Sequence, residues 1–152
     1  MTQHTYSSLV VWNGTTAGGY RSYRRDHTAS ACPALQELCL SADPAFRGNP
    51  ELLNPEQLLT VAASSCLLLS FLALASRTGL DIHSYQDRSA AVLDTSTEPV
   101  RVTEIVLSPT IHVTSGTDAS QVKAVLESAH LGCYIANTLN CPVRLEPTVV
   151  EP

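Results

Sequence analysis

The fold is decided by residues 54–79, which read NPEQLLTVAASSCLLLSFLALASRTG. Asn54 followed by Pro55 is the favoured order at the start of a helix, with the asparagine as N-cap and the proline at the first helical position. Gly79 then predicts the end of the helix. Because the whole middle of the run is uncharged, we expect a long helix that is buried on nearly all sides and carries the thiol of Cys66.

This helix must be weighed against a membrane span. The apolar run from Leu58 to Ala75 is close to the minimum of about 20 residues that a bilayer requires. Thr60 and three serines interrupt the run, and no basic flank sets an orientation. The amphipathic segments that follow also need a surface to pack on. A central helix in a protein core is therefore the favoured interpretation, with no membrane as a partner.

The rest of the chain alternates between strand and helix signals. Strands are expected at residues 6–12, 20–26, 35–40, 82–93, 100–113 and 143–149, and short helices at residues 120–131 and 133–139. The change in apolar parity near Thr103 and Glu104 predicts a bulge, and Pro109 predicts a kink. We therefore expect one α+β domain over residues 1–152, in which an antiparallel sheet wraps around the long helix.

Charge and composition exclude several classes of function. The net charge is -5, which argues against a nucleic-acid partner, since phosphate binding needs clustered Lys and Arg. The compact basic cluster Arg21, Arg24 and Arg25 is too small for such a surface. Only 15% of the residues are charged, so a second copy of the chain is expected to cover apolar surface. The N-terminus has no signal-peptide pattern, so a cytoplasmic location is expected.

Five cysteines are present, an odd number and too few for a scaffold built on disulfides. Cys66 lies in the apolar helix, and Cys133 lies between two predicted short elements. This pair suggests redox chemistry. The start of the short helix after Cys133 is expected to lower the pKa of its thiol. Cys32 and Cys39 have no metal-ligand spacing, and no metal site is expected.

Several motifs of the chain resemble one known family, the OsmC/Ohr thiol-dependent peroxidases, and most closely its OsmC-like branch. The resemblance spans nearly the whole chain. Its motifs are YRRDH at residues 23–27, SADPAFRG at 41–48, NPEQLL at 54–59 with Cys66 ten residues after Glu56, YQD at 85–87, and AHLGCYIAN at 129–137. Their order and spacing are specific in combination.

The resemblance implies the roles of four residues and a fold. Cys66 would be the peroxidatic cysteine and Cys133 the resolving cysteine. Arg25 would stabilise the thiolate, and Glu56 would hold that arginine. The fold would be OsmC-like, an intertwined homodimer with each active site at the subunit interface. The choice of Arg25 over Arg24 rests on the Asp-His that follows. Cys141, where relatives are expected to have no cysteine, leaves open which thiol resolves Cys66.

The residues make chemical sense in these roles. A thiolate is the nucleophile, and burial disfavours it, so a fixed guanidinium is needed to offset burial. The implied function is reduction of organic or lipid hydroperoxides through a Cys66 sulfenic acid and a Cys66–Cys133 disulfide. An external dithiol, for example of the lipoyl type, would restore the thiols, and no metal, flavin or haem cofactor is required. The alternative is an OsmC-fold dimer in a stress response that binds thiols or small molecules without turnover.

Overall fold

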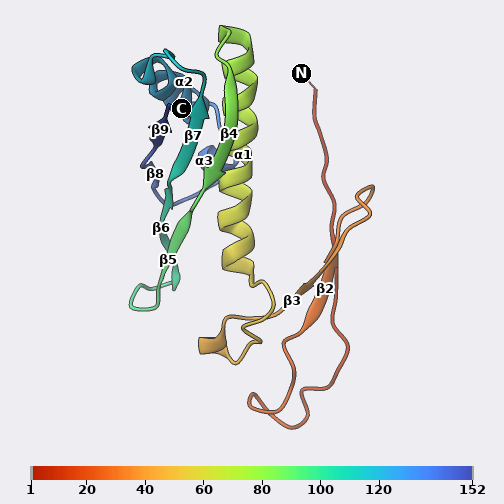
Figure 1. Ribbon diagram of the computed structural model, residues 1–152. Helices are drawn as coiled ribbons and strands as arrows, with labels where there is room; N and C mark the ends of the chain where they lie inside the picture. Colours follow the sequence, from red (N-terminus) through yellow and green to blue (C-terminus); the bar gives the residue numbers. More distant parts are fainter. Residues whose placement is uncertain (1, 152) are drawn as a thin grey trace. The chain divides into compact units, whose positions relative to one another are not determined.

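The computed structural model describes residues 2–151, and the chain forms two compact units (Figure 1). The N-terminal unit extends to Leu58, and the C-terminal unit begins at Leu59. The long helix α1, Pro55–Thr78, begins in the first unit and continues in the second. Each unit is described by itself.

Three short strands form the sheet of the N-terminal unit. They are β1 (Leu9–Val11), β2 (His27–Ser30) and β3 (Glu37–Leu40), paired antiparallel in the order β1-β2-β3. A single turn of 3-10 helix, η1 (Pro44–Phe46), follows in the loop after β3. The strand predicted at residues 20–26 is wrong, because residues 18–23 form turns. The Arg25 guanidinium bonds to backbone carbonyls of this segment, which holds it in a turn instead of an extended ladder.

The C-terminal unit contains two three-stranded sheets and three helices. The sheets are β4-β7-β9 and β5-β6-β8. The strands are β4 (Ile82–Asp87), β5 (Ala90–Asp94), β6 (Arg101–Leu107), β7 (Pro109–Val113), β8 (Val143–Leu145) and β9 (Thr148–Val150). The helices are α1, α2 (Ala119–Leu131) and α3 (Tyr134–Thr138). The predicted α+β class with a long central helix is confirmed.

Each of the three longer predicted strands is divided into two, one part for each sheet. The breaks fall after Asp87, at Ser108 and after Leu145. Hydrogen bonds connect the residues at these breaks. The Ser108 N–H donates to Asp87 Oδ1 at 2.7 Å, and the Glu146 N–H donates to the Leu107 carbonyl at 2.8 Å. The predicted kink at Pro109 is confirmed, since β7 begins there.

The strand pairing is mixed, which corrects the expectation of a purely antiparallel sheet. β4 with β7 and β5 with β6 are antiparallel, whereas β8 joins β6 and β9 joins β7 in parallel. The parallel pairs arise because α2 and α3 lie between β7 and β8 in the chain and form a crossover. The predicted bulge is confirmed: Val92 pairs with Glu104 and Leu93 with Val102, so Thr103 is the extra residue.

Helix α1 begins and ends as its sequence predicts. The Asn54 side chain accepts a hydrogen bond from the Gln57 N–H at 2.8 Å, and the Gln57 side chain accepts one from the Asn54 N–H at 2.9 Å. This reciprocal pair is a capping box. Gly79 has a φ of 74°, the left-handed conformation that ends many helices, and the Leu80 N–H returns to the Ala75 carbonyl.

One face of α1 forms the centre of the C-terminal core. The buried positions recur every three or four residues: Thr60, Ala63, Leu67, Phe71 and Ala75. They pack against buried residues of β6, β7 and α2, namely Ile105, Leu107, Ile111, Val113, Val122, Val125, Leu126 and Ala129. Figure 1 shows β4 and β7 running along α1. The interpretation of α1 as a core helix agrees with this packing, although its length and mean hydropathy of 2.2 also suit a membrane span.

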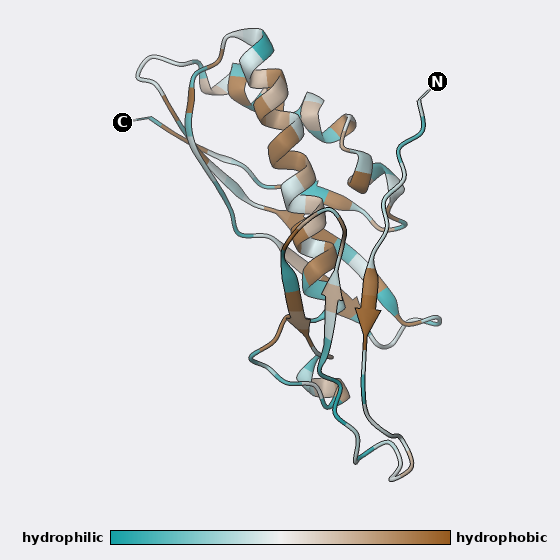
Figure 2. Ribbon diagram, turned by 90° about the vertical axis from the view of Figure 1, so that its right-hand side faces the viewer, coloured by the Kyte–Doolittle hydropathy of each residue, from teal (hydrophilic) through white to brown (hydrophobic). Residues whose placement is uncertain are grey.

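The opposite face of α1 is exposed in the single chain, so the expectation of nearly complete burial is wrong. Val61, Leu69 and Leu72 are 55%, 66% and 40% exposed. These three positions share one side of the helix, since they are separated by eight and three residues. Figure 2 shows apolar residues along most of the length of α1. The helix is therefore apolar on more sides than one chain covers.

Candidate functional site

The structure brings Cys66 and Cys133 together in the C-terminal unit. Cys66 projects from α1 and is partly exposed, while Cys133 is fully buried. The two thiols lie close enough for the Cys66 side chain to raise the pKa of Cys133. Cys133 reaches this position because α2 ends at Gly132 and the chain turns there, with the Cys133 N–H donating to the His130 carbonyl at 3.0 Å. α3 then begins, with Cys133 as its N-cap residue.

The surroundings of Cys133 raise the pKa of its thiol. Burial is the largest cause, and the hydrogen bond to Cys66 adds to it. The backbone N–H groups of Ala136 and Ile135, in the first turn of α3, lower the pKa but are outweighed. The predicted lowering by the short helix is thus wrong in its net direction. The buried Cys133 thiol therefore resists ionisation.

Tyr85 and Asp87 of β4 contact helix α1, through Phe71 and Ser64 respectively. Burial raises the pKa of Tyr85 well above its ordinary value, and the negative charge of Asp87 raises it further. The Asp87 carboxylate accepts hydrogen bonds from the Ser64 hydroxyl of α1 and the Ser108 N–H. The Tyr85 ring packs on Phe71 with 6.0 Å between centroids. Tyr85 and Asp87 are two residues apart in the strand, so alternation places both side chains on the same face of β4.

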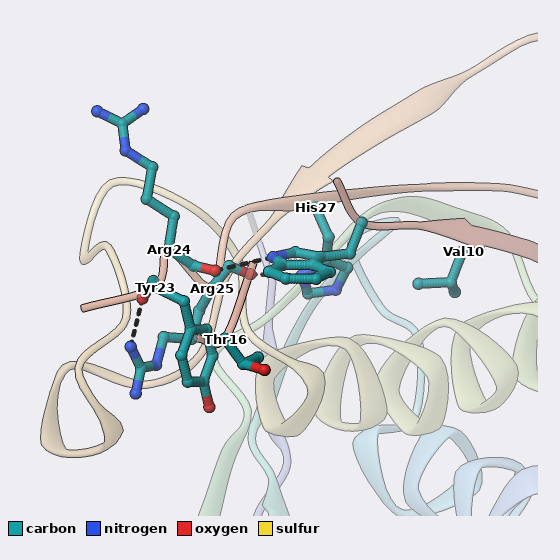
Figure 3. Close-up of a pocket in the computed structure, with 7 residues that line it drawn as sticks. Val10, Thr16, Tyr23, Arg24, Arg25 and His27 are labelled. Atoms are coloured by element: carbon teal, nitrogen blue, oxygen red, sulfur yellow. Dashed lines mark hydrogen bonds between the residues drawn. The ribbon is translucent and has the colours of Figure 1, made fainter. Parts of the chain in front are cut away.

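Arg25 is held in the N-terminal unit by aromatic rings and backbone carbonyls. Its guanidinium donates to the carbonyls of Tyr23 and of Tyr20, the latter at 2.6 Å. The guanidinium carbon lies 3.9 Å from the Tyr23 ring centroid and 4.6 Å from that of Tyr20, which is cation–π geometry. The Arg24 side chain is exposed and extends away from these groups (Figure 3). Of the two arginines, Arg25 is therefore the one with a fixed position.

Arg25 also lines two pockets of the N-terminal unit. One, of about 370 Å³, is bounded by Val10, Trp12, Thr16, Tyr23, Arg24, Arg25 and His27 (Figure 3). The other, of about 190 Å³, is bounded by Arg25, His27, Ser41, Ala42, Asp43, Phe46, Pro55 and Glu56. Arg25 and Glu56 thus line the same pocket. Glu56 itself is half-buried in the first turn of α1.

The loop after β3 forms this second pocket through polar contacts. Buried Ser41 donates to Asp26 Oδ1 at 2.9 Å and accepts from the Asn49 N–H at 3.0 Å. Asp43 caps η1 by accepting from the Ala45 N–H. A Cβ atom on Gly48 would lie 1.6 Å from the Ala42 carbonyl oxygen, so no larger residue fits there. The SADPAFRG motif is therefore needed to close this loop.

The other cysteines are not part of either group. Cys141 is partly buried against the C-terminal core, and Cys32 and Cys39 are exposed in the N-terminal unit. Within residues 2–151, no group of three or more His, Cys, Asp or Glu side chains is arranged to hold a metal ion. The predicted site residues thus form two pairs, Cys66 with Cys133 in one unit and Arg25 with Glu56 in the other.

The fold is shared with solved structures. An OsmC-like protein of unknown function from Vibrio cholerae is 27% identical, with a TM-score of 0.84, over 95% of this chain and 99% of its own. Organic hydroperoxide resistance proteins from Elizabethkingia anophelis and Legionella pneumophila are 16% and 17% identical, with TM-scores of 0.74 and 0.70. These two matches cover 99% and 98% of both chains, respectively. No curated protein matches the chain.

The family model of OsmC-like proteins matches residues 48–148, more than half of the chain. The matched segment contains Glu56, Cys66 and Cys133. Arg25 lies outside it, although the structural matches extend over that region. The agreement of the segment, the fold and the motifs leads to one conclusion: this chain belongs to the OsmC-like (OsmC/Ohr) family.

Proposed function

We propose that the protein is a thiol-dependent peroxidase that reduces organic hydroperoxides to alcohols. The observation that carries this proposal is the proximity of Cys66 and Cys133, two cysteines that are far apart in the sequence. Both cysteines are free thiols, and oxidation of one of two neighbouring thiols leads to a disulfide between them. Two of the structural relatives are organic hydroperoxide resistance proteins, which supports the same substrate class.

The reaction begins with attack of the Cys66 thiolate on the terminal oxygen of the hydroperoxide. The O–O bond breaks, Cys66 becomes a sulfenic acid, and the released alkoxide takes a proton and leaves as the alcohol. The Cys133 sulfur then attacks the Cys66 sulfur, which releases water and forms the disulfide. An external dithiol, for example of the lipoyl type, reduces the disulfide by exchange. Two electrons pass from the two thiols to the peroxide.

The unequal surroundings of the two thiols support this order of roles. Cys66 is partly exposed, so a substrate can reach it, whereas Cys133 is fully buried. The raised pKa of Cys133 keeps that thiol protonated, which suits a residue that waits for the sulfenic acid.

Arg25 and Glu56 are proposed to act on Cys66 from a second copy of the chain. Glu56 and Cys66 lie on the same helix ten residues apart, an axial separation of about 15 Å at 1.5 Å per residue. Glu56 therefore cannot touch the Cys66 of its own helix. Arg25 lines a pocket together with Glu56, and in a dimer its guanidinium could stabilise the Cys66 thiolate of the second chain.

The same homodimer would cover the apolar face of α1. Val61, Leu69 and Leu72 are exposed in the single chain, and such a stripe is typical of an interface. We propose that both units work in this dimer as one OsmC-like domain, in the cytoplasm, without nucleic acid or membrane as partners and without a metal or organic cofactor.

The alternative function is binding without turnover. It is favoured by the pocket of about 370 Å³ between Trp12, Tyr23 and Arg25, which has room for a small organic molecule. In that case Cys66 would not be oxidised during function.

One experiment separates the two. The reduced protein is treated with one equivalent of cumene hydroperoxide, and oxidised cysteines are located by mass spectrometry. If the protein is a peroxidase, we expect a Cys66–Cys133 disulfide and release of the alcohol. The Cys141→Ser variant should give the same result as the wild type. No oxidation of Cys66, or a disulfide that excludes it, would contradict the peroxidase.

A further inference from the structure

The guanidinium of Arg25 makes two kinds of contact with the same two residues of the N-terminal unit. It donates hydrogen bonds to the backbone carbonyls of Tyr20 and Tyr23. Its carbon also lies 3.9 Å from the Tyr23 ring centroid and 4.6 Å from the Tyr20 ring centroid. The two rings stand at 81° to each other with 6.2 Å between their centroids. Tyr20 and Tyr23 thus form a tyrosine cage around the cation, and Figure 3 shows its Tyr23 side.

The rings are the part of this cage that depends on residue type. Any residue at positions 20 and 23 would present a backbone carbonyl, whereas only an aromatic side chain presents a π face to the cation. A guanidinium also has more N–H groups than the two carbonyl bonds use, so donors remain for a further acceptor. The cage therefore fixes the Arg25 side chain without exhausting its ability to bind an anion.

Tyr23 is the better fixed of the two rings. It is half-buried and meets the Trp12 ring edge to face, with 6.2 Å between centroids and 84° between the ring planes. The Trp12 indole N–H in turn donates to the Arg24 carbonyl at 2.8 Å. Tyr20, by contrast, is 59% exposed. We therefore expect the Tyr23 ring to contribute more to the position of the guanidinium.

An aromatic cage preserves the charge of the cation that it holds. The face of a ring attracts a cation through its quadrupole but carries no net charge. These contacts therefore orient the Arg25 guanidinium and leave its positive charge to act on a nearby anion. A long side chain that is already ordered also loses less rotamer freedom when it engages that anion.

We propose that Tyr23, supported by Tyr20, is a positioning residue of the peroxidase reaction. Its ring holds the Arg25 guanidinium in the orientation that stabilises the Cys66 thiolate of the second chain. This inference rests on the proposed function, in which Arg25 acts on that thiolate. Tyr23 acts through Arg25 alone and needs no contact with the thiol or with the hydroperoxide.

The test removes each ring with and without the arginine. Tyr23→Leu removes the aromatic face, Tyr23→Phe keeps it and removes only the hydroxyl, and Tyr20→Leu removes the more exposed ring. Tyr6→Leu is the control, because Tyr6 belongs to the same unit and is 91% exposed. Each substitution is made in the wild type and in Arg25→Ala. The readouts are thermal unfolding and the rate of the first oxidation of Cys66 by cumene hydroperoxide, measured by stopped flow at several pH values.

With Arg25 present, Tyr23→Leu is expected to slow the first oxidation about two- to fivefold at neutral pH, the range of one exposed cation–π contact. Tyr20→Leu should slow it less, Tyr23→Phe should restore the wild-type rate because it restores the ring, and Tyr6→Leu should change nothing. The slowing should decrease as the pH rises, because thiolate then forms without a cation. In the Arg25→Ala background, Tyr23→Leu should have no further effect on the rate.

The double substitution separates positioning from a general effect on the fold. Equal slowing by Tyr23→Leu in both backgrounds would overturn the inference, since the ring would then act independently of Arg25. If Tyr23→Leu is clearly less stable than the wild type, Tyr20→Leu decides in its place. A slowing by Tyr20→Leu that disappears in Arg25→Ala supports the cage, and an unchanged rate in both backgrounds overturns it.

Failure of the cage can be told from failure of the proposed function. If Arg25→Ala slows the oxidation but Tyr23→Leu reacts as fast as the wild type, the cage has no role, although the peroxidase stands. If the wild type does not oxidise Cys66 at all, or if Arg25→Ala reacts as fast as the wild type, the proposed function is wrong at that step and this inference is wrong with it.

Discussion

The two units differ in the interactions that stabilise each of them internally. The C-terminal unit has an apolar core formed by one face of α1 with β6, β7 and α2, and it carries the thiol pair on that core. In residues 2–58 of the N-terminal unit, by contrast, only Leu40, Ser41 and Asn54 are buried. Leu9, Val10 and Leu35 there are 61%, 61% and 99% exposed. A chain segment of this size with so little core is not expected to be stable without a surface to cover it.

Polar anchors replace the core in the N-terminal unit. Arg25 is bonded to the carbonyls of Tyr20 and Tyr23, and Ser41 joins Asp26 to Asn49. Such contacts set local geometry more than they contribute free energy, because each hydrogen bond is worth only about 1 kcal/mol net. We infer that the C-terminal unit supplies most of the stability and, in the proposed peroxidase, the nucleophile, while the N-terminal unit supplies a positioned cation. The following experiments test this division.

The largest effect is expected for Cys66→Ser, which should abolish hydroperoxide reduction. A serine hydroxyl is not oxidised by peroxide, so no sulfenic acid can form. The fold should persist, with a loss of about 1 kcal/mol or more if the hydroxyl lacks a partner. Alcohol formation and circular dichroism are the measurements. Activity close to that of the wild type would remove the nucleophile from the C-terminal unit.

Cys133→Ser should permit a first turnover and then stall. Cys66 can still attack the peroxide, but its sulfenic acid has no thiol to condense with and over-oxidises under excess peroxide. Dimedone should trap the sulfenic acid in this variant. Cys141→Ser is the control and should turn over normally. Trapping in Cys141→Ser and not in Cys133→Ser would make Cys141 the resolving thiol.

Phe71→Ala and Leu69→Ala compare the two faces of α1. Phe71 is fully buried in the C-terminal core, so its loss should cost about 3–5 kcal/mol in the free energy of unfolding. Leu69 is 66% exposed, and its loss should cost less than about 0.5 kcal/mol in an isolated chain. In the proposed dimer Leu69→Ala should instead weaken association, measured by sedimentation. An unchanged dimer would show that this face is not the interface.

Arg25→Ala should slow the first oxidation step at neutral pH by about 10- to 100-fold, the effect of removing one nearby opposite charge from the thiolate. A higher pH should restore part of the rate, because it supplies thiolate directly. Arg25→Lys should restore activity only partly, since an ammonium lacks the planar fork. Arg24→Ala is the control. Stopped-flow measurement of the first turnover decides between them, and a larger effect at Arg24 would reverse the assignment.

The smallest effect concerns the stability of the reduced protein against pH. Burial and Cys66 raise the pKa of Cys133, so the folded state binds this proton more tightly than the unfolded state. The resulting stability is fully present below the ordinary thiol pKa of about 8.5 and is lost as the pH rises toward the higher folded value. The denaturant concentration at the unfolding midpoint should therefore decrease as the pH rises from about 8 to about 9.5. This range lies below the one in which tyrosine titrates. The midpoint should decrease less in Cys133→Ser than in the wild type. In Cys39→Ser, which removes an exposed thiol, it should decrease as much as in the wild type. Parallel curves for all three proteins would contradict the assigned direction.

The sequence predicted best where signals are local. The capping pair Asn54 and Gln57 and the stop at Gly79 lie within a few residues of the ends they define, so α1 has the expected bounds. The bulge at Thr103 followed from parity within a single strand. The prediction of a strand at residues 20–26 was wrong because an alternation of Tyr and Arg is compatible with both a strand and a turn. Only the carbonyls that Arg25 reaches distinguish them.

By itself the sequence determined the α+β class, the long helix and the two cysteines to examine, because these depend on periodicity, caps and motif order. The tertiary structure decided the rest. It divided the long strands where Asp87 meets Ser108, placed Cys133 near Cys66, and enclosed the Arg25 guanidinium between two tyrosine rings. It also reversed the predicted direction of the Cys133 pKa. Burial and contacts between residues distant in the chain control these features, and no local pattern encodes them.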